Sequence, residues 1–332
     1  MRLLCAYNER RTCMARRTRP ARWHTQNFLR DLGLAGTLVD RAGLTNTDLV
    51  YEMGAGTGTI TAALADRCRA VIANEIDVPL CDRLRSRFAA RRTVQVRCGD
   101  FRAEPLPDEP YKVFANPPFD MTSEIVGKLV GAARPPDDTF LVVQREAAER
   151  YCGTPIESLA GLLLKPWFAL SIVRRFHRDD FRPKPSVEVV MLRLRKRGPP
   201  LVAPDDAQAY RDLVVSGFTA WRPTIGDALA QPFGQRAARR LLDTAVLDPA
   251  LRPTQVPFDA WLRLATVFVR MPDALRGRIG GAEARLRRHQ SHLRKQHRSR
   301  APRDALGSVH RDLAAGSSAP TAVDEVPAML FR

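Results

Sequence analysis

The chain has 332 residues, of which 45% are hydrophobic and 27% charged, and this composition predicts a folded protein with one large and one smaller domain. It contains no run of about 18 apolar residues, so we expect no membrane span. The formal net charge is +17 and the sequence pI is near 10.5, which indicates a polyanionic partner, with nucleic acid as the leading candidate.

The first segment, 1–20, is rich in arginine and poor in apolar residues, so it is predicted to be a flexible basic arm. It lacks the apolar centre of a signal peptide, which favours a cytoplasmic location. The six cysteines are scattered and form no CxxC pair, so we expect reduced thiols and no metal site.

Residues 21–197 alternate short apolar runs with helix-like segments, which is typical of a parallel α/β sheet. The fold class expected is α/β, with a seven-stranded Rossmann-like sheet and a small C-terminal helical domain. Ligands of such sheets bind beyond the carboxyl ends of the strands. The expected strands are 48–53, 70–77, 93–101, 111–119, 139–146, 168–176 and 187–195.

The C-terminal third differs in composition. Residues 195–206 are predicted to be a linker, 207–280 a helical RNA-binding domain, and 285–332 a basic and then low-complexity disordered tail. The histidines of the tail have no metal-ligand partners in the sequence. Basic residues around the last two strands either contact phosphates or form solvated surface, and these are Arg174, Arg175, Arg178, Arg193, Arg195, Lys196 and Arg197.

The first strand runs into the glycine-rich sequence YEMGAGTGTIT, with a helix expected from about Thr59. Glycines at Gly54, Gly56 and Gly58 allow a sharp turn and a close approach by a ligand. The third glycine comes too early for a dinucleotide fingerprint. The pattern ExGxGxG fits better with S-adenosylmethionine, which has no pyrophosphate, and the alternative is a glycine turn without a ligand.

Acidic residues follow the next two strands. Glu75 lies 21 residues after Gly54 and is the preferred ligand of the ribose hydroxyls, with Asp77 as the competitor. Asp100 is placed to accept a hydrogen bond from the adenine amino group, with Phe101 beside the ring. Taken alone, Asp100 would be read as a helix or turn cap.

The fourth strand runs into FANPPFD, 114–120. The Asn116 side-chain oxygen and the Pro117 carbonyl are each positioned to accept one hydrogen of an exocyclic amine such as adenine N6. This would direct the nitrogen lone pair at a methyl donor, while Phe119 stacks on the base. The base must be single-stranded or flipped out of a duplex. Catalysis would then come from positioning and from hydrogen bonds that strengthen as charge develops.

The ordered motifs QNFL (26–29), EMGAGTG, NEID, GDF, ANPPF and FRPKPSVEVV (181–190) resemble the ribosomal RNA adenine N6-methyltransferases, and within them the Erm macrolide-resistance methylases. The resemblance covers residues 22–195. It implies a class I methyltransferase sheet that binds S-adenosylmethionine as the cofactor. The cofactor-binding residues implied are Gln26, Asn27, Leu29, Gly54, Gly56, Glu75, Ile76, Asp100, Phe101 and Asn116.

The resemblance assigns catalysis to Asn116, Pro117 and Phe119, while Phe181 is either one side of a base clamp or a packing residue. The implied partner is 23S ribosomal RNA, protein-free or in a precursor particle, and the protein is expected to be a monomer. Mono- or dimethylation of one adenine would block macrolide, lincosamide and streptogramin B drugs. The alternatives are a housekeeping small-subunit dimethyltransferase, which typically has NLPY, and a non-catalytic nucleic-acid-binding factor. An NAD-dependent oxidoreductase is disfavoured by the missing third glycine.

Overall fold

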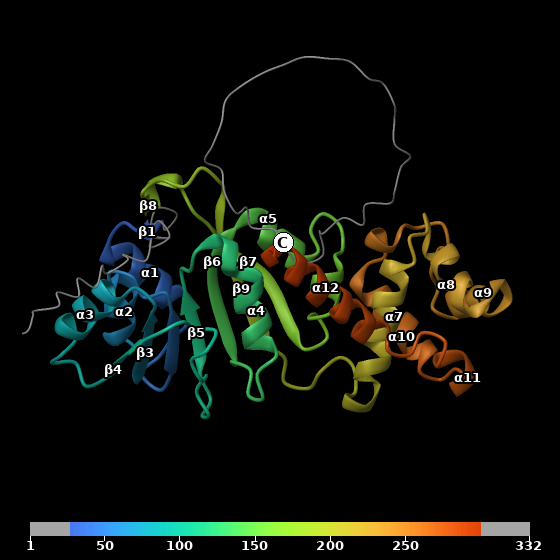
Figure 1. The fold of residues 1–332 in the computed structure, drawn as a ribbon, viewed down its shortest axis with the longest axis horizontal. Helices are drawn as coiled ribbons and strands as arrows, with labels where there is room; N and C mark the ends of the chain where they lie inside the picture. Colours follow the sequence, from blue (N-terminus) through green and yellow to red (C-terminus); the bar gives the residue numbers. More distant parts are fainter. Residues whose placement is uncertain (1–26, 300–332) are drawn as a thin grey trace, which may run out of the picture.

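The computed structural model describes residues 27–299 (Figure 1). The expected N-terminal arm, Gln26 and the low-complexity end of the chain lie outside these residues. The described chain forms an α/β body followed by a helical body, side by side along the longest axis of the molecule. No helix in residues 27–299 is long and apolar enough to cross a membrane.

The α/β body is built on a seven-stranded sheet with the strand order β4-β3-β2-β5-β6-β9-β7. Strand β9 runs antiparallel to both of its neighbours, and the pairs from β4 to β6 are parallel. The expected sheet is therefore confirmed. Its strands are β2 (Leu49–Met53), β3 (Ala70–Glu75), β4 (Val94–Cys98), β5 (Lys112–Ala115), β6 (Asp138–Gln144), β7 (Phe168–Arg175) and β9 (Val189–Lys196).

Five strands end earlier than expected, namely β3, β4, β5, β6 and β7, and a helix cap and a proline explain the ends of β3 and β5. After β3, the Asp77 carboxylate accepts a hydrogen bond from the Leu80 amide at 3.0 Å and so caps helix α3 (Val78–Arg87). After β5, Pro117 has no amide hydrogen to donate. These early ends leave loops at the carboxyl edge of the sheet, where the site residues lie.

Helices cover both faces of the sheet, because neighbouring residues of each buried strand point to opposite sides. Val50 of β2 packs with the helices α1 (Leu32–Arg41) and α2 (Thr59–Ala65). Its neighbour Tyr51 packs with α4 (Thr122–Val130) and α5 (Arg145–Cys152). The expected helix start at Thr59 is confirmed.

A separate two-stranded ribbon lies beside the main sheet, where β1 (Phe28–Leu29) pairs with β8 (Phe181–Arg182) (Figure 1). Leu29 and Phe181 are partners in its register, and both side chains are buried. The ribbon holds the start of the described chain against the α/β body.

The helical body packs around the buried side chains of Tyr210, Trp261 and Phe268. The Tyr210 hydroxyl donates a 2.8 Å hydrogen bond to the Leu162 carbonyl, which joins this body to the short helix α6 (Leu159–Leu162). The remaining helices are α7 (Ala207–Thr219), α8 (Ile225–Phe233), α9 (Gln235–Thr244), α10 (Phe258–Phe268), α11 (Asp273–Arg276) and α12 (Ala282–Ser299).

Helix α12 differs from the sequence-based expectation, which assigned everything from residue 285 to a disordered tail. The structure continues as a helix to Ser299. Sequence analysis missed it because the segment has no apolar periodicity, which is the main signal of an amphipathic helix. The helix is fixed at its start by contacts with α7 that are distant in sequence.

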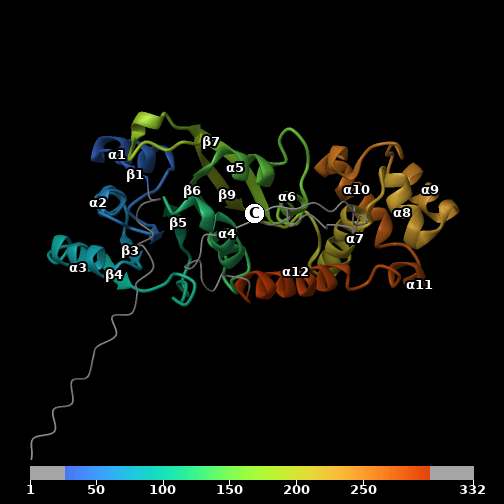
Figure 2. The same ribbon diagram turned by 45° about the horizontal axis from the view of Figure 1, so that its top comes forward.

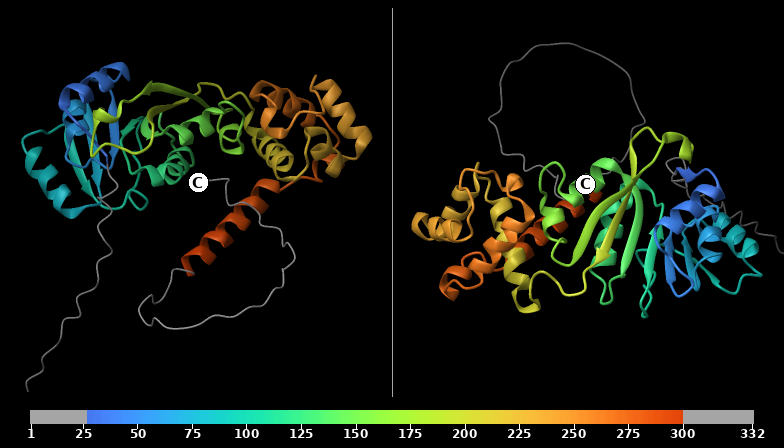
Figure 3. Two further views of the ribbon diagram at one scale, coloured as in Figure 1. Left: turned by 90° about the horizontal axis from the view of Figure 1, so that it is seen from above. Right: turned by 180° about the vertical axis from the view of Figure 1, so that it is seen from behind.

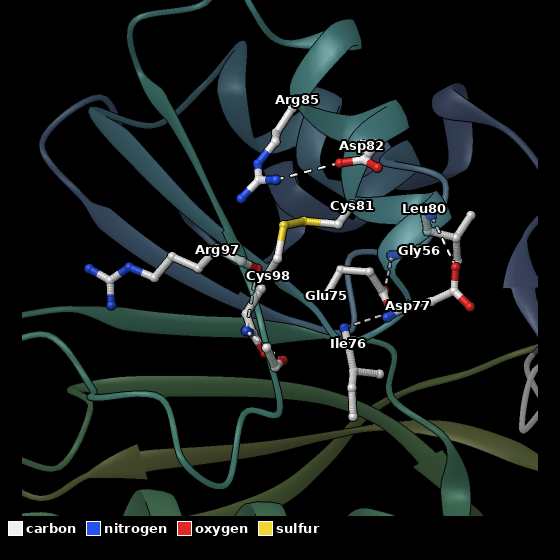
Figure 4. The surroundings of a disulfide bond; sticks show 12 residues. Gly56, Glu75, Ile76, Asp77, Leu80, Cys81, Asp82, Arg85, Arg97 and Cys98 are labelled. Carbon is white, nitrogen blue, oxygen red and sulfur yellow. Dashed lines mark hydrogen bonds and ion pairs between the residues drawn. A yellow bond between two sulfur atoms is a disulfide. The ribbon is translucent and has the colours of Figure 1, made fainter. Parts of the chain in front are cut away.

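The expectation of reduced thiols is wrong for one pair, since Cys81 and Cys98 form a disulfide (Figure 4). Helix α3 folds back on β4, which brings the two Cα atoms to 5.8 Å although the residues are 17 apart in sequence. Cysteine spacing alone does not reveal such a pairing. Cys68 and Cys152 are free thiols.

Candidate active site

The glycine loop after β2 has the backbone conformation that its sequence predicts. Gly54 and Gly56 have φ angles of 71° and 57°, in the left-handed region that favours glycine. The amide of Gly54 donates to the Asn74 carbonyl at 2.9 Å, which ties the loop to the end of β3. The first turn of α2 begins at Thr59, so its free amide groups face the same edge of the sheet.

Glu75 is a buried acid that binds the backbone amides of two loops at this edge of the sheet. Its side chain is 1% exposed, and its carboxylate accepts hydrogen bonds from the amides of Gly56 (2.7 Å), Ile76 (2.9 Å) and Asp77 (3.0 Å) (Figure 4). A carboxylate has about four acceptor positions, so Oε2 keeps capacity for one more donor. The neighbouring Ile76 side chain is 58% exposed and offers an apolar surface beside this acceptor.

Asp77, the competing candidate, has a different task. Its carboxylate caps α3 at the Leu80 amide, as an N-cap aspartate does. The structure thus favours Glu75 as the ligand-binding acid of this strand end.

The Phe28 ring lies against the glycine loop. A Cβ atom added to Gly56 would come within 2.6 Å of Phe28 Cε1, so only glycine fits beneath this ring. Asn27 immediately precedes it, and β1 holds both residues over the loop. The start of the described chain, at Asn27 and Phe28, therefore lies over the glycine loop.

A second buried acid, Glu52, lies at the end of β2, just before the glycine loop. Its carboxyl accepts a 2.6 Å hydrogen bond from the Thr61 hydroxyl. Burial raises the pKa of Glu52 to about 8, with the charge of Glu75 adding to the rise and the Thr61 hydrogen bond opposing it. Glu52 is therefore protonated at neutral pH. As a neutral carboxyl it holds α2 through the hydrogen bond from Thr61.

Asp100 lies on the loop after β4 and is paired with a cation. Its carboxylate accepts from Arg102 Nε at 2.9 and 2.8 Å and from the Arg102 amide at 3.0 Å. Glu124 lies 3.5 Å from the same guanidinium. The adenine-binding role expected of Asp100 thus requires the ligand to share this carboxylate with Arg102.

The Asp100 loop is held from two sides. The Lys128 ammonium donates to the carbonyls of Phe101, Arg102 and Glu104. From the sheet side, the side-chain nitrogen Nδ2 of Asn74, on β3, donates to the Gly99 carbonyl at 3.1 Å. These contacts fix the backbone that carries Asp100.

The turn after β5 brings the catalytic candidates together. The Asn116 amide nitrogen donates a 2.8 Å hydrogen bond to the Asn27 carbonyl, which leaves the side-chain oxygen Oδ1 directed away from that bond. Pro117 lies close to the glycine loop, since a Cβ on Gly54 would be 3.8 Å from its Cα. Within residues 27–299, no group donates to the Pro117 carbonyl oxygen. Phe119 is half-buried and begins the short 3-10 helix η2 (Phe119–Met121).

Three aromatic or apolar candidates are in the core rather than at an open surface. Phe181 is 1% exposed and meets Phe176 with ring centroids 5.2 Å apart, so packing, one of its two expected roles, is what the structure supports. Phe101 is 8% exposed and packs in the core cluster of the sheet, and its place beside an adenine ring stays a prediction. Leu29 is buried as well, at 4% exposure, and packs in the core cluster that includes Phe181.

Sequence reasoning missed Phe28, Lys128 and Arg102. Phe28 stood in the quoted QNFL motif, but nothing in the motif indicates that its ring rests on a glycine. Lys128 bonds to carbonyls 24 to 27 residues away, and such a contact leaves no local pattern. For Arg102, the sequence offered one signal, namely that this arginine follows Asp100 by two residues and could pair with its carboxylate.

The strand order and the glycine loop define the class of protein. They are those of the Rossmann-like methyltransferases, and the crystal structure described as "23S rRNA methyltransferase ErmE" matches with a TM-score of 0.68 and 30% identity, covering 73% of this chain and 99% of that one. Within this class, residues 20–269 match the family described as ribosomal RNA adenine dimethylase. The chain belongs to that family, whose members use S-adenosylmethionine to methylate adenine in ribosomal RNA.

Two relatives with different names match this chain at similar sequence identity. A protein named rRNA methyltransferase from Streptomyces thermotolerans is 33% identical over 246 residues, which is 74% of this chain and 82% of that protein. The Ribosomal RNA small subunit methyltransferase A of a Synechococcus species is 31% identical, over 75% of this chain and 93% of that protein. These identities show the family, but they do not distinguish large-subunit from small-subunit ribosomal RNA as the substrate.

The residues present fit S-adenosylmethionine. Glu75 keeps an acceptor for a ribose hydroxyl, and the exposed Ile76 side chain offers apolar contact to the adenine ring. Gly54 leaves its loop open to the methionine part, because nothing beyond Pro117 lies within 4 Å of its missing Cβ. These residues converge on the edge where the Asn116 turn lies.

Proposed function

We propose that the protein methylates N6 of one adenine in 23S ribosomal RNA and thereby confers resistance to macrolide, lincosamide and streptogramin B antibiotics. The observation that carries the proposal is the turn Asn116–Pro117–Pro118–Phe119, with its two prolines and a phenylalanine. The small-subunit enzymes typically have NLPY here. The ErmE structure, at 30% identity and 99% coverage of its own chain, supports the same choice.

The chemistry of the target amine explains the residues of the turn. The lone pair of an exocyclic amine is delocalised into the ring, so it is a weak nucleophile. Asn116 Oδ1 and the Pro117 carbonyl would each accept one amine hydrogen, which localises the lone pair on nitrogen. Bound S-adenosylmethionine supplies a methyl group already activated by its sulfonium. The hydrogen bonds strengthen as positive charge develops on the nitrogen.

The contact with Asn27 gives Asn116 its orientation. Because Nδ2 is committed to the Asn27 carbonyl at 2.8 Å, Oδ1 is the end of the side chain left to accept from the amine, which supports the proposal. Pro117 contributes a carbonyl whose direction is restrained by its ring. This preorganisation means that the groups need little rearrangement when the base arrives.

The substrate adenine has to leave its stack to reach this turn. The half-buried Phe119 ring offers a stacking face for a base flipped out of the RNA. The helical body would bind the surrounding RNA, and we expect a monomer that acts in the cytoplasm on protein-free 23S RNA or a precursor particle. A housekeeping enzyme for the small subunit is the second candidate, favoured by the Synechococcus relative.

The test is a methylation assay with purified protein, labelled S-adenosylmethionine and protein-free 23S or 16S RNA, with the modified base mapped by primer extension. The proposal expects label on one 23S adenine near the peptidyl-transferase loop. Label on 16S RNA would favour the housekeeping enzyme instead. Cofactor binding without label on either RNA would favour a non-catalytic RNA-binding factor.

A further inference from the structure

Helix α12 begins with a buried anchor on the helical body. The Asp212 side chain of α7 is 5% exposed, and its two oxygens accept hydrogen bonds from the amides of Gly281 and Glu283, both at 2.9 Å. An acidic group at a helix N-terminus satisfies free amides and interacts favourably with the helix dipole. The direction in which α12 leaves the helical body is therefore fixed by α7.

The first turns of α12 carry three further contacts. The buried Glu283 carboxylate pairs with Arg287 at 2.6 Å and accepts from Gln208 of α7 at 3.3 Å. Leu286 packs against the core of the helical body. These contacts anchor the first two turns of the helix.

Beyond this anchor, α12 has no apolar face to bury. No large apolar residue stands between Leu286 and Leu293, and the side chains of Arg285, Arg288 and His289 are exposed. Figures 2 and 3 show the helix leaving the helical body as a separate rod, and the left view of Figure 3 shows it projecting away from the α/β body. A surface helix normally buries an apolar stripe, so this arrangement points to a polar partner.

The charge of α12 identifies the chemistry of that partner. The segment 282–299 contains six arginine or lysine residues and three histidines against one glutamate. Arg285 and Arg288 are three residues apart on the helix, where like charges repel. Within residues 27–299, neither has an acidic partner, although Arg285 also donates to the Gly280 carbonyl at 2.7 Å. A polyanion would relieve this repulsion.

We propose that α12 is a phosphate-binding arm, which contacts the backbone of a double-helical RNA stem beside the target adenine. The inference rests on the proposed function for the identity of the RNA. Guanidinium groups bind phosphate oxygens in a bidentate manner, independent of base sequence. An anionic membrane surface is disfavoured because amphipathic membrane helices need an apolar face, which α12 lacks.

The arm adds to the catalytic body rather than forming part of it. It lies beyond residues 20–269, which match the family. Arg193, one of the basic residues considered for phosphate contact, is instead fixed by Asp138, whose two carboxylate oxygens are each 3.0 Å from its Nε. Exposed α12 residues are therefore better placed than Arg193 to meet RNA.

The experiment compares full-length wild-type protein with R285A/R288A and with the control R83A/R92A, which removes two exposed arginines of the α/β body, on and just after α3. Binding to labelled RNA hairpins from 23S and 16S RNA is measured by fluorescence anisotropy over a salt series. For R285A/R288A we expect about tenfold weaker binding to both hairpins at low salt. The slope of log K against log salt should fall by about two, since each lost phosphate contact removes about 0.9. R83A/R92A should match the wild type.

The variant R285K/R288K should restore affinity, because it restores the charge. Unchanged binding by R285A/R288A, or an equal loss in the R83A/R92A control, would overturn the proposal. So would binding of α12 to phosphatidylglycerol vesicles that R285A/R288A abolishes while RNA affinity stays intact. Because both hairpins are tested, the role of Arg285 and Arg288 in phosphate binding can be judged even if 23S RNA is not the substrate.

Discussion

The side-chain amide of Asn116 donates a 2.8 Å hydrogen bond to the backbone carbonyl of Asn27, across 89 residues of sequence. This bond joins the turn that ends β5 to the segment that covers the glycine loop. Under the proposed mechanism, it would also determine which end of the Asn116 side-chain amide faces the substrate. The segment over the glycine loop and the Asn116 turn are thus joined by a direct contact.

Replacing Asn116 by aspartate tests that bond. Aspartate keeps an acceptor oxygen but has no hydrogen to donate, so a carboxylate oxygen would face the Asn27 carbonyl. We expect the rate of methyl transfer to fall at least about 100-fold, as for other losses of a preorganised polar contact. Asn116→Ala should fall as far. Single-turnover kinetics measure the effect, and an aspartate variant with the wild-type rate would show that the Asn27 contact is dispensable.

Substitution of Gly56 by alanine should damage both stability and cofactor binding. The φ angle of 57° disfavours alanine, and its Cβ would meet the Phe28 ring at 2.6 Å. Gly43→Ala is the matched control, since Gly43 has a φ of 65° and nothing within 4 Å of the added Cβ. Urea unfolding should show a loss of about 1 kcal/mol for the control, from the left-handed backbone alone. Only Gly56→Ala should weaken S-adenosylmethionine binding in calorimetry, and equal affinities would contradict the contact.

Lys128 is predicted to be a positioning residue for the Asp100 loop. Lys128→Met keeps a long apolar stem but leaves the carbonyls of Phe101, Arg102 and Glu104 without their donor. We expect the dissociation constant of S-adenosylmethionine to rise about tenfold, which corresponds to about 1.4 kcal/mol, with little change in kcat at saturating cofactor.

The control for this variant is Lys112→Met, which removes the 2.8 Å ion pair with Asp48 at the opposite end of β5. It should lower stability without changing cofactor affinity. If both variants weaken binding equally, Lys128 acts through general stability and not through the Asp100 loop.

Glu52 should make folding stability depend on pH. Burial raises its pKa from 4.5 to about 8, so the folded protein keeps a proton that the unfolded chain releases. The stabilising contribution is full below pH 4.5 and is lost as the pH rises to about 8, with a slope of up to about 1.4 kcal/mol per pH unit. Glu52→Gln removes this titration. Urea midpoints from pH 5 to pH 9 should therefore decline more steeply in the wild type, and parallel curves would refute the assignment.

The main sheet could be predicted from sequence because its strands are buried on both faces and read as continuous apolar runs. Glu75 and Asn116 could be placed because parallel strands deliver their following residues to one edge. Their hydrogen-bond partners could not be, since Asn27 lies 89 residues from Asn116.

Other features depend on contacts between distant segments. The burial of Phe181 follows from the pairing of β1 with β8, and the Cys81–Cys98 bond follows from α3 folding onto β4. Helix α12 depends on a cap from Asp212, about 70 residues earlier in the chain (69 and 71 residues from its two donors). Contacts between segments that are distant in sequence cannot be inferred from local sequence patterns.

The most direct test of the proposed function is the methylation state of 23S RNA in a macrolide-susceptible bacterium that expresses this protein. Mass spectrometry of RNA fragments should find one adenine in the peptidyl-transferase region carrying N6-methyl groups, together with growth in erythromycin. Cells that express Asn116→Ala should show neither. Unmodified 23S RNA in cells that contain the folded wild-type protein would contradict the account.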